Sequence, residues 1–284
     1  MSIRIVADSS SNVYALEGAN FVTVPMKVIA GEKEFTDTPS QSVAEMVRYL
    51  KGYTGKSGSS CPNVQEWLDA FAGEDDIIAI TISGPLSGSY NSAKQAAEEF
   101  VSEHPGRKAY VIDSKTAGPQ MMLIVEKLLA LIGEGLDFDT VVAKGIEYAN
   151  STHILFCLES MMNLARNGRV SVAAAKLAGV LGIRGVGDVR QGQITTVAKP
   201  RGAKKATQTL VEMMKERGFR DGAQLRIAHC FGEEQANAVF DAVRAEFPNA
   251  RFTLEPTTCL CSFYAEAGGL MIGFEGGFNE NNHN

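Results

Sequence analysis

Short apolar runs with strand character alternate with helix-like segments through the first half of the sequence. The strand-like runs are IRIVADS, FVTVPMKVIA, DIIAITIS and AYVIDS, at residues 3–9, 21–30, 76–83 and 109–114. The segments with helical spacing are 42–50, 63–73, 89–104, 120–135 and 138–151. Short strands that are apolar on both faces are typical of a parallel sheet covered by helices on both sides. The pattern therefore predicts an α/β fold in which the first half forms a three-layer domain with a parallel sheet.

The second half has a different order of elements. Its strand-like runs lie at 153–160, 192–202, 225–231, 251–256 and 269–274, and its helix-like segments at 173–182, 203–217 and 233–247. The strand near residue 192 looks exposed, whereas the later strands are more apolar, which indicates a mixed sheet with helices. We therefore predict two domains, residues 1–152 and residues 153–284, the second being a smaller α/β domain with a mixed sheet.

Composition and charge exclude several classes of protein. The 284 residues carry a net charge of −6 with a pI near 5.4, which argues against a nucleic-acid partner. No apolar run approaches the roughly 18 residues of a transmembrane helix, and the N-terminus MSIRIVADSS does not resemble a signal peptide. The five cysteines form no C-x-x-C motif and the four histidines are scattered, so we predict reduced thiols, no metal site and a cytoplasmic location.

Hydroxyl-rich stretches follow three of the predicted strands and precede one predicted helix. They are residues 8–11, 83–88, 113–116 and 57–62. Ligands of parallel α/β sheets sit beyond the carboxyl ends of the strands, where free N–H groups and hydroxyls suit a negatively charged group. Any one of these stretches is more often an ordinary cap or turn. Because their predicted positions share one edge of the sheet, together they indicate a binding site.

The common catalytic signatures are absent from the sequence. There is neither a Walker phosphate-binding loop nor a G-x-G-x-x-G dinucleotide fingerprint. The Gly84–Gly88 segment is not a nucleophile elbow, since Leu86 occupies the position of the serine. His229 lies in an apolar strand and fits a core histidine better than a catalytic base. The sequence therefore argues against these types of nucleotide site and serine hydrolase, and we expect no cofactor.

Seven short motifs, in order along nearly the whole chain, resemble those of the DegV family. They are ADSS at 7–10, VPMKV at 24–28, SSCP at 59–62, SGPLSGSYNSA at 83–93, VIDSKTA at 111–117, NGRVS at 167–171 and GGLMIGF at 268–274. The resemblance implies two α/β domains that hold a long-chain fatty acid, such as palmitate, in a tunnel between them. It also implies a carrier rather than an enzyme. In some bacteria, carriers of this family present the acyl chain to a separate ATP-dependent kinase.

The resemblance places the carboxylate headgroup on five residues of this chain. Ser59 stands where the family usually has threonine, with Ser60 beside it, and Gly84 stands where the family has a serine, with Ser83 beside it. Glu275 falls on the family's C-terminal histidine. We expect Ser83 to end a strand, the N–H groups around Gly84 to be free for the ligand, Ser59 to lie opposite and Glu275 to form the third side.

The same comparison assigns residues to the side that faces a kinase and the phosphoryl group. The Gly168-Arg169 pair matches the family's Gly-Arg motif, and Asp8 and Ser9 belong to the first hydroxyl-rich stretch. We expect Arg169, Asp8 and Ser9 to lie on this partner side. The fixed charge and forked donors of arginine suit a phosphate.

Glu275 raises an electrostatic problem for a carboxylate ligand. An ionised glutamate only accepts hydrogen bonds, and two carboxylates about 4 Å apart repel by roughly 4 kcal/mol at an effective dielectric near 20. Either one carboxyl holds a proton, or Lys115 or Arg169 neutralises the pair, or Glu275 points away, or the ligand is uncharged. These four alternatives stay open at the level of sequence.

A second function is open as well. The DegV fold is similar to the substrate-binding subunit of dihydroxyacetone kinase, which suggests an enzyme or substrate-binding subunit for a small hydroxylated or phosphorylated metabolite. That subunit holds its substrate with a histidine, and no histidine lies in the four hydroxyl-rich stretches. The fatty-acid carrier is therefore the favoured prediction.

Overall fold

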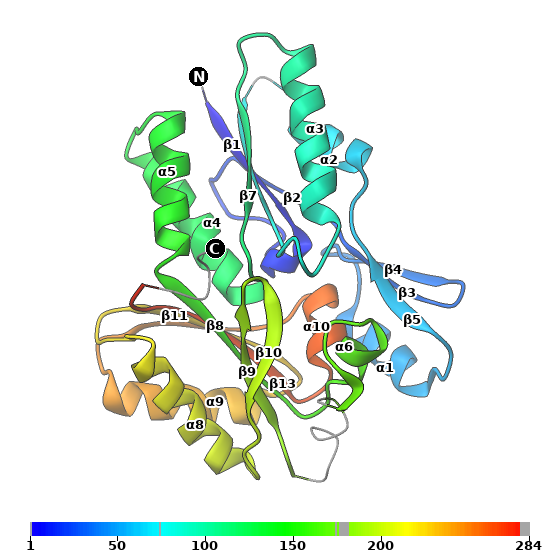
Figure 1. Ribbon diagram of the computed structural model, residues 1–284, viewed down its shortest axis with the longest axis vertical. Helices are drawn as coiled ribbons and strands as arrows, with labels where there is room; N and C mark the ends of the chain where they lie inside the picture. Colours follow the sequence, from blue (N-terminus) through cyan, green and yellow to red (C-terminus); the bar gives the residue numbers. More distant parts are fainter. Residues whose placement is uncertain (1, 74, 174, 176–181, 279–284) are drawn as a thin grey trace.

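The N-terminal sheet has four parallel strands in the spatial order β2-β1-β6-β7. The computed structural model describes residues 2–73, 75–173, 175 and 182–278, and Figure 1 shows their arrangement. The strands of this sheet are β1 (Ile3–Asp8), β2 (Phe21–Val24), β6 (Asp76–Thr81) and β7 (Ala109–Asp113). Its covering helices are α2 (Val64–Phe71), α3 (Ser89–Glu103), α4 (Gly118–Gly133) and α5 (Phe138–Ala149).

Alternate residues of strand β6 pack into two separate cores on opposite faces of the sheet. Ile77 and Ala79 lie in the core formed with α2 and α3, whereas Ile78 and Ile80 lie in the core formed with α4 and α5. Side chains of a strand point alternately to its two faces, so both faces can be buried only if the whole strand is apolar. The predicted three-layer parallel domain is confirmed.

The C-terminal sheet has six strands in the order β10-β9-β8-β13-β11-β12. Its strands are β8 (Thr152–Leu158), β9 (Gly185–Arg190), β10 (Gln193–Ala198), β11 (Gln224–Cys230), β12 (Arg251–Pro256) and β13 (Gly269–Glu275). Only the β11–β12 pair is parallel among the described pairs of this sheet, which confirms the predicted mixed sheet. Strand β9 was not predicted. The sheet begins at Thr152, and the division of the chain into domains at this point stays a prediction.

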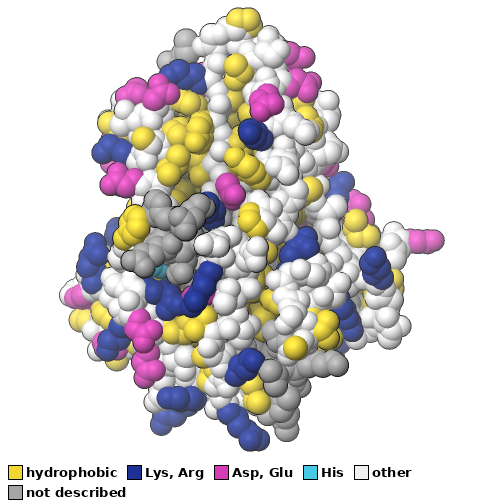
Figure 2. Space-filling model, in the orientation of Figure 1, with side chains coloured by type: hydrophobic (Ala, Val, Ile, Leu, Met, Phe, Trp, Pro, Cys, Tyr) yellow, Lys and Arg dark blue, Asp and Glu magenta, His cyan; other side chains and the backbone are white. Residues whose placement is uncertain are grey.

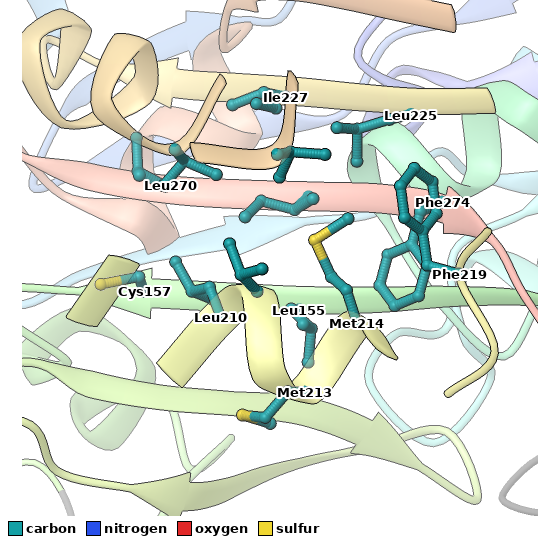
Figure 3. Packing of buried hydrophobic residues seen from close by; sticks show 14 of the residues in the cluster. Leu155, Cys157, Leu210, Met213, Met214, Phe219, Leu225, Ile227, Leu270 and Phe274 are labelled. Carbon is teal, nitrogen blue, oxygen red and sulfur yellow. The ribbon is translucent and has the colours of Figure 1, made fainter. Parts of the chain in front are cut away.

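The two faces of the C-terminal sheet have different covers. Helices α8 (Ala203–Glu216) and α9 (Glu233–Glu246) pack on one face, where Leu210 and Met214 meet Leu270 and Phe274 (Figure 3). The first turn of α4 lies directly on the other face. A Cβ atom at Gly273 would stand 2.3 Å from the Gln120 nitrogen, so this close approach requires glycine.

A third sheet of three antiparallel strands, in the order β4-β3-β5, was not predicted. Its strands are β3 (Lys27–Ala30), β4 (Lys33–Thr36) and β5 (Ser57–Ser60). The prediction of one continuous strand over 21–30 is wrong. The chain leaves the N-terminal sheet at Pro25 and enters the small sheet, because proline has no N–H group to donate to a neighbouring strand. Residues 57–60, in the hydroxyl-rich stretch before α2, form strand β5, where no strand was predicted. The helix predicted over 173–182 lies mostly outside the described residues.

Helix α10 (Cys259–Ala265) carries the C-terminal part of the chain back to the small sheet. It packs with α1 (Val43–Gly52) and near α6 (Met162–Arg166), and these helices lie beside β3 and β5 in Figure 1. Leu260 and Phe263 share a core with Met26, Val28 and Phe35. The two halves of the chain therefore meet around α10.

Charged side chains of both signs are spread over the face shown in Figure 2. In the described part of the chain, no helix is long and apolar enough to cross a membrane. Over the same residues, no group of three or more histidine, cysteine, aspartate or glutamate side chains could hold a metal ion.

Candidate functional site

A cavity of about 270 Å³ lies between α10, the small sheet and the loop that follows β6. Its volume is close to the lower end of the usual range for small-molecule sites, about 300 to 1,000 Å³. Most of its lining is apolar, with hydroxyls and one guanidinium among the rest. The lining residues are Ser10, Met26, Ser59, Ser60, Cys61, Ile82, Leu86, Ser87, Gly88, Ala117, Leu164, Arg169, Ile194, Leu260, Cys261, Tyr264 and Met271.

The buried carboxylate of Asp37 fixes helix α10 along this cavity. Its Oδ1 atom accepts hydrogen bonds from the Cys259 N–H at 2.8 Å and the Tyr14 hydroxyl at 2.7 Å, and its Oδ2 atom accepts from the Leu260 N–H at 3.2 Å. Burial raises the pKa of Asp37, and the hydrogen bonds act in the opposite direction. The carboxylate thus satisfies N–H groups at the start of the helix and leaves Tyr264, one turn later, facing the cavity.

Hydroxyl and guanidinium groups gather at one end of the cavity. The Ser59 Oγ and Tyr264 Oη atoms are 2.7 Å apart and form a hydrogen bond. Arg169 donates from Nη1 to the Asn167 carbonyl at 2.6 Å, and the Asn167 side chain lies so close to Gly58 that a Cβ atom there would stand 2.9 Å from Asn167 Oδ1. The loop that carries Arg169 is therefore seated against β5 beside Ser59. This polar end offers two hydroxyls and a positive charge, which suit a carboxylate.

Mostly apolar groups line the part of the cavity around Met271, which we call its apolar end. Cys261, one helical turn before Tyr264, contacts the Ser10 carbonyl through its thiol at 3.6 Å. A Cβ atom at Gly118 would stand 2.7 Å from the Met271 Cε atom and 3.9 Å from the Cys261 Sγ atom, so the start of α4 closes this end. The lining residues Met26, Ile82, Ala117 and Leu260 belong to one apolar cluster, against which Tyr264 also packs. The wall of the cavity is therefore mostly apolar, and the polar end interrupts it at Ser59, Tyr264 and Arg169.

Three of the predicted site residues line the cavity and two neighbouring ones do not. Ser59, Ser60 and Arg169 are lining residues. The Ser83 hydroxyl instead donates to the Gly192 carbonyl at 2.6 Å, and the Gly84 N–H donates to Asp113 Oδ1 at 3.1 Å. The expectation of free N–H groups around Gly84 is therefore wrong, and β6 ends at Thr81 rather than Ser83.

The hydroxyl of Ser83 holds the β9–β10 hairpin beside the loop that follows β6. Gly192 forms the tip of the β9–β10 hairpin and has φ of +73°, and a Cβ atom there would stand 2.4 Å from Ser83 Oγ. This hairpin supplies Ile194 to the cavity wall. The serine thus fastens a segment of the C-terminal sheet to the loop of the N-terminal sheet.

Glu275 lies away from the cavity. Its Oε1 atom accepts from the Tyr148 hydroxyl and its Oε2 atom accepts from the Gln224 N–H, each at 2.8 Å, and Arg251 lies 3.5 Å from Oε2. The prediction that Glu275 forms the third side of the headgroup site is therefore wrong. Of the four alternatives left by the sequence, the structure has the one in which Glu275 points away.

Asp8 and Ser9 are completely buried, contrary to their expected place on a partner-facing side. Asp8 accepts hydrogen bonds from the Ile82 N–H at 3.0 Å and the Ser89 hydroxyl at 2.6 Å, and also from Ser10. Burial raises the pKa of Asp8, while these hydrogen bonds lower it. Ser9 Oγ accepts from the Met26 N–H at 2.9 Å. Both residues therefore support the cavity wall from behind.

Tyr264 is a polar residue of the cavity that the sequence analysis did not predict. It lies on a helix of only seven residues, whose N-cap Thr258 makes no side-chain capping bond. A short apolar run without a capping signal does not distinguish a helix from a strand or a loop. The available signal was weaker: one tyrosine in the buried segment CLCSFYA, whose hydroxyl needs a partner when it is buried.

The chain is similar to known proteins over nearly its whole length. The model of the DegV family, a family described as uncharacterised, matches residues 2–275. A DegV domain-containing protein of Streptococcus gordonii is 37% identical over 280 residues, which cover 97% of this chain and 99% of the relative.

Two solved structures are similar over the same extent. One is a DegV family protein from Eubacterium eligens loaded with heptadecanoic acid, with 36% identity, a TM-score of 0.94 and coverage of 97% of this chain and 100% of the other. The second is the Fatty Acid Kinase (Fak) B3 protein of Streptococcus pneumoniae loaded with linoleic acid, with 36% identity, a TM-score of 0.94 and coverage of 97% and 99%.

Proposed function

The chain belongs to the DegV family, and from this premise we propose that it binds a long-chain fatty acid in the cavity beside α10. The carboxylate would lie at Ser59, Tyr264 and Arg169, and the acyl chain would extend toward Met271. The single observation that carries this proposal is the cavity itself, which combines one polar end with an apolar body.

The polar end suits an ionised headgroup. The Ser59–Tyr264 pair can turn its two hydroxyl hydrogens toward a carboxylate, which only accepts hydrogen bonds, and Arg169 supplies a permanent positive charge. Glu275, the carboxylate that would have opposed such a ligand, is engaged elsewhere. The repulsion considered from the sequence therefore does not arise at this site.

The lining argues against a small hydroxylated or phosphorylated metabolite. Such a ligand needs polar partners on several sides, because each buried polar group without a hydrogen bond weakens binding. Apolar side chains occupy most of the wall, and no histidine is among the lining residues. The dihydroxyacetone-kinase-like alternative is thus disfavoured.

We also propose that the protein is a carrier that works in the cytoplasm and presents its fatty acid to a separate kinase. Arg169 is partly exposed as well as part of the cavity lining, so its guanidinium can reach both the headgroup and a docked protein. In an assay with a fatty acid kinase, Arg169→Ala should reduce acyl phosphate formation by more than it reduces fatty-acid binding. Equal losses in the two assays would remove the support for a role toward the kinase.

The binding proposal is tested by analysing the ligand that copurifies with the protein. Extraction with organic solvent followed by mass spectrometry should yield a long-chain fatty acid such as palmitate or oleate. Added fatty acid at 100 times its Kd should raise the free energy of unfolding by about 2.7 kcal/mol. A protein that yields no acyl chain and gains no stability from palmitate or oleate would disprove the proposal.

A further inference from the structure

Met271 lies in the wall of the cavity at its apolar end. Its neighbours Leu270 and Ile272 point into the core beneath α8 and α9, so Met271 projects from the opposite face of β13. Leu270 and Ile272 are fully buried, whereas Met271 keeps partial solvent accessibility because the cavity reaches it. The side chain therefore has free space on its cavity side.

Gly118 provides the space for the other side of this methionine. A Cβ atom at Gly118 would stand 2.7 Å from Met271 Cε and 3.3 Å from Met271 Sδ. The backbone at Gly118 has φ of +59°, in the left-handed region where a side chain is strained. The tip of Met271 thus rests in a recess at the start of α4 that only glycine leaves open.

The other apolar side chains of the lining are less able to change their shape around a ligand. Leu260 is held by its backbone bond to Asp37, and Met26 is 2% exposed and packed in the core with Phe35. Methionine is unbranched and has three rotatable bonds, so it fills irregular gaps and can change its shape at little cost. Among the described residues of the apolar end, Met271 combines a flexible side chain with free space beside it.

The geometry points to Met271 as the residue that sets the length of the bound acyl chain, an inference that rests on the proposed fatty-acid function. The carboxylate is fixed at the polar end, so additional methylene groups extend toward β13 and the start of α4. Met271 limits this extension, and shortening it opens a continuation of the cavity. Each methylene group that becomes buried strengthens binding by about fourfold.

The test compares saturated fatty acids that differ by two carbons, in direct competition for the full-length protein. Met271→Ala removes the Cγ, Sδ and Cε atoms, so the affinity for an acid two carbons longer than the preferred one, relative to the preferred one, should rise about 15-fold. Met271→Val, a milder truncation that suits a strand, should shift the ratio in the same direction by a smaller factor.

Two control variants separate this effect from general loosening and from headgroup recognition. Met213→Ala makes the same truncation beneath the opposite face of the C-terminal sheet, where Figure 3 shows Met213 in the other core, and should leave the ratio unchanged. Ser59→Ala should lower the affinity for both acids by the same factor. If Met271→Ala and Met271→Val bind fatty acids with the parent's ratio, the assignment of Met271 is overturned while fatty-acid binding stands. If the parent protein binds no fatty acid, both proposals fail.

Discussion

Replacing Tyr264 with phenylalanine removes one hydroxyl group from the polar end and leaves the ring in place. In the structure this hydroxyl is 2.7 Å from Ser59 Oγ, and the ring packs edge-on against Phe263 at a centroid distance of 4.8 Å. A hydrogen bond to a charged group contributes about 1.5 to 3 kcal/mol, which corresponds to a loss of about 10- to 150-fold in affinity. The Tyr264 hydroxyl already has Ser59 as a partner before the ligand arrives, so we expect a loss near the lower end, about tenfold.

The assay measures the affinity for palmitate and for its methyl ester, by titration calorimetry or competition. The ester carries no charge and accepts weaker hydrogen bonds, so Tyr264→Phe should weaken its binding by less than about threefold. Tyr148→Phe is the matched control, because the Tyr148 hydroxyl bonds to Glu275 outside the cavity. Equal losses for acid and ester, or no loss for the acid, would refute the placement of the carboxylate at Tyr264.

Three further predictions concern predicted site residues that do not line the cavity. Glu275→Gln should leave palmitate affinity within about twofold of the parent in the same titration, and a tenfold change would contradict its position outside the site. Ser83→Ala should lower the free energy of unfolding in urea by about 1 kcal/mol through the lost bond to Gly192, with unchanged affinity; a loss of binding instead would return Ser83 to the headgroup. Burial raises the pKa of Asp8 in the folded protein, so the stability contributed by its protonated form is present below the unfolded pKa near 3.9 and is lost as the pH rises through the folded pKa. The stability of the parent minus that of Asp8→Asn should therefore fall as the pH is raised across this window in urea titrations, and a rising difference would show the opposite shift.

The layered architecture could be predicted from the sequence because it follows from patterns within single segments of the chain. Each strand of a parallel sheet buries both faces, so runs such as residues 77–80 must be apolar throughout, and the intervening helices show their own period. The ordered motifs also predicted Ser59, Ser60 and Arg169 as site residues, and all three line the cavity. Whether they hold a headgroup stays a proposal.

The small sheet and helix α10 could not be predicted in the same way. Their segments are four to seven residues long, and Pro25 interrupts an otherwise continuous run of strand-like residues. A short segment has too few residues to show a period, so its structure depends on the partner it packs against.

The sequence by itself determined that this chain forms layered α/β sheets with hydroxyl-rich stretches, three of which follow strands of the parallel sheet. Only the tertiary structure decided which of those hydroxyls face a ligand. Ser83 reaches a hairpin 109 positions later, Glu275 reaches a tyrosine 127 positions earlier, and Ser59 meets Tyr264 across 205 positions. The direction of each side chain follows from the register and packing of distant segments, which no local pattern of residues records.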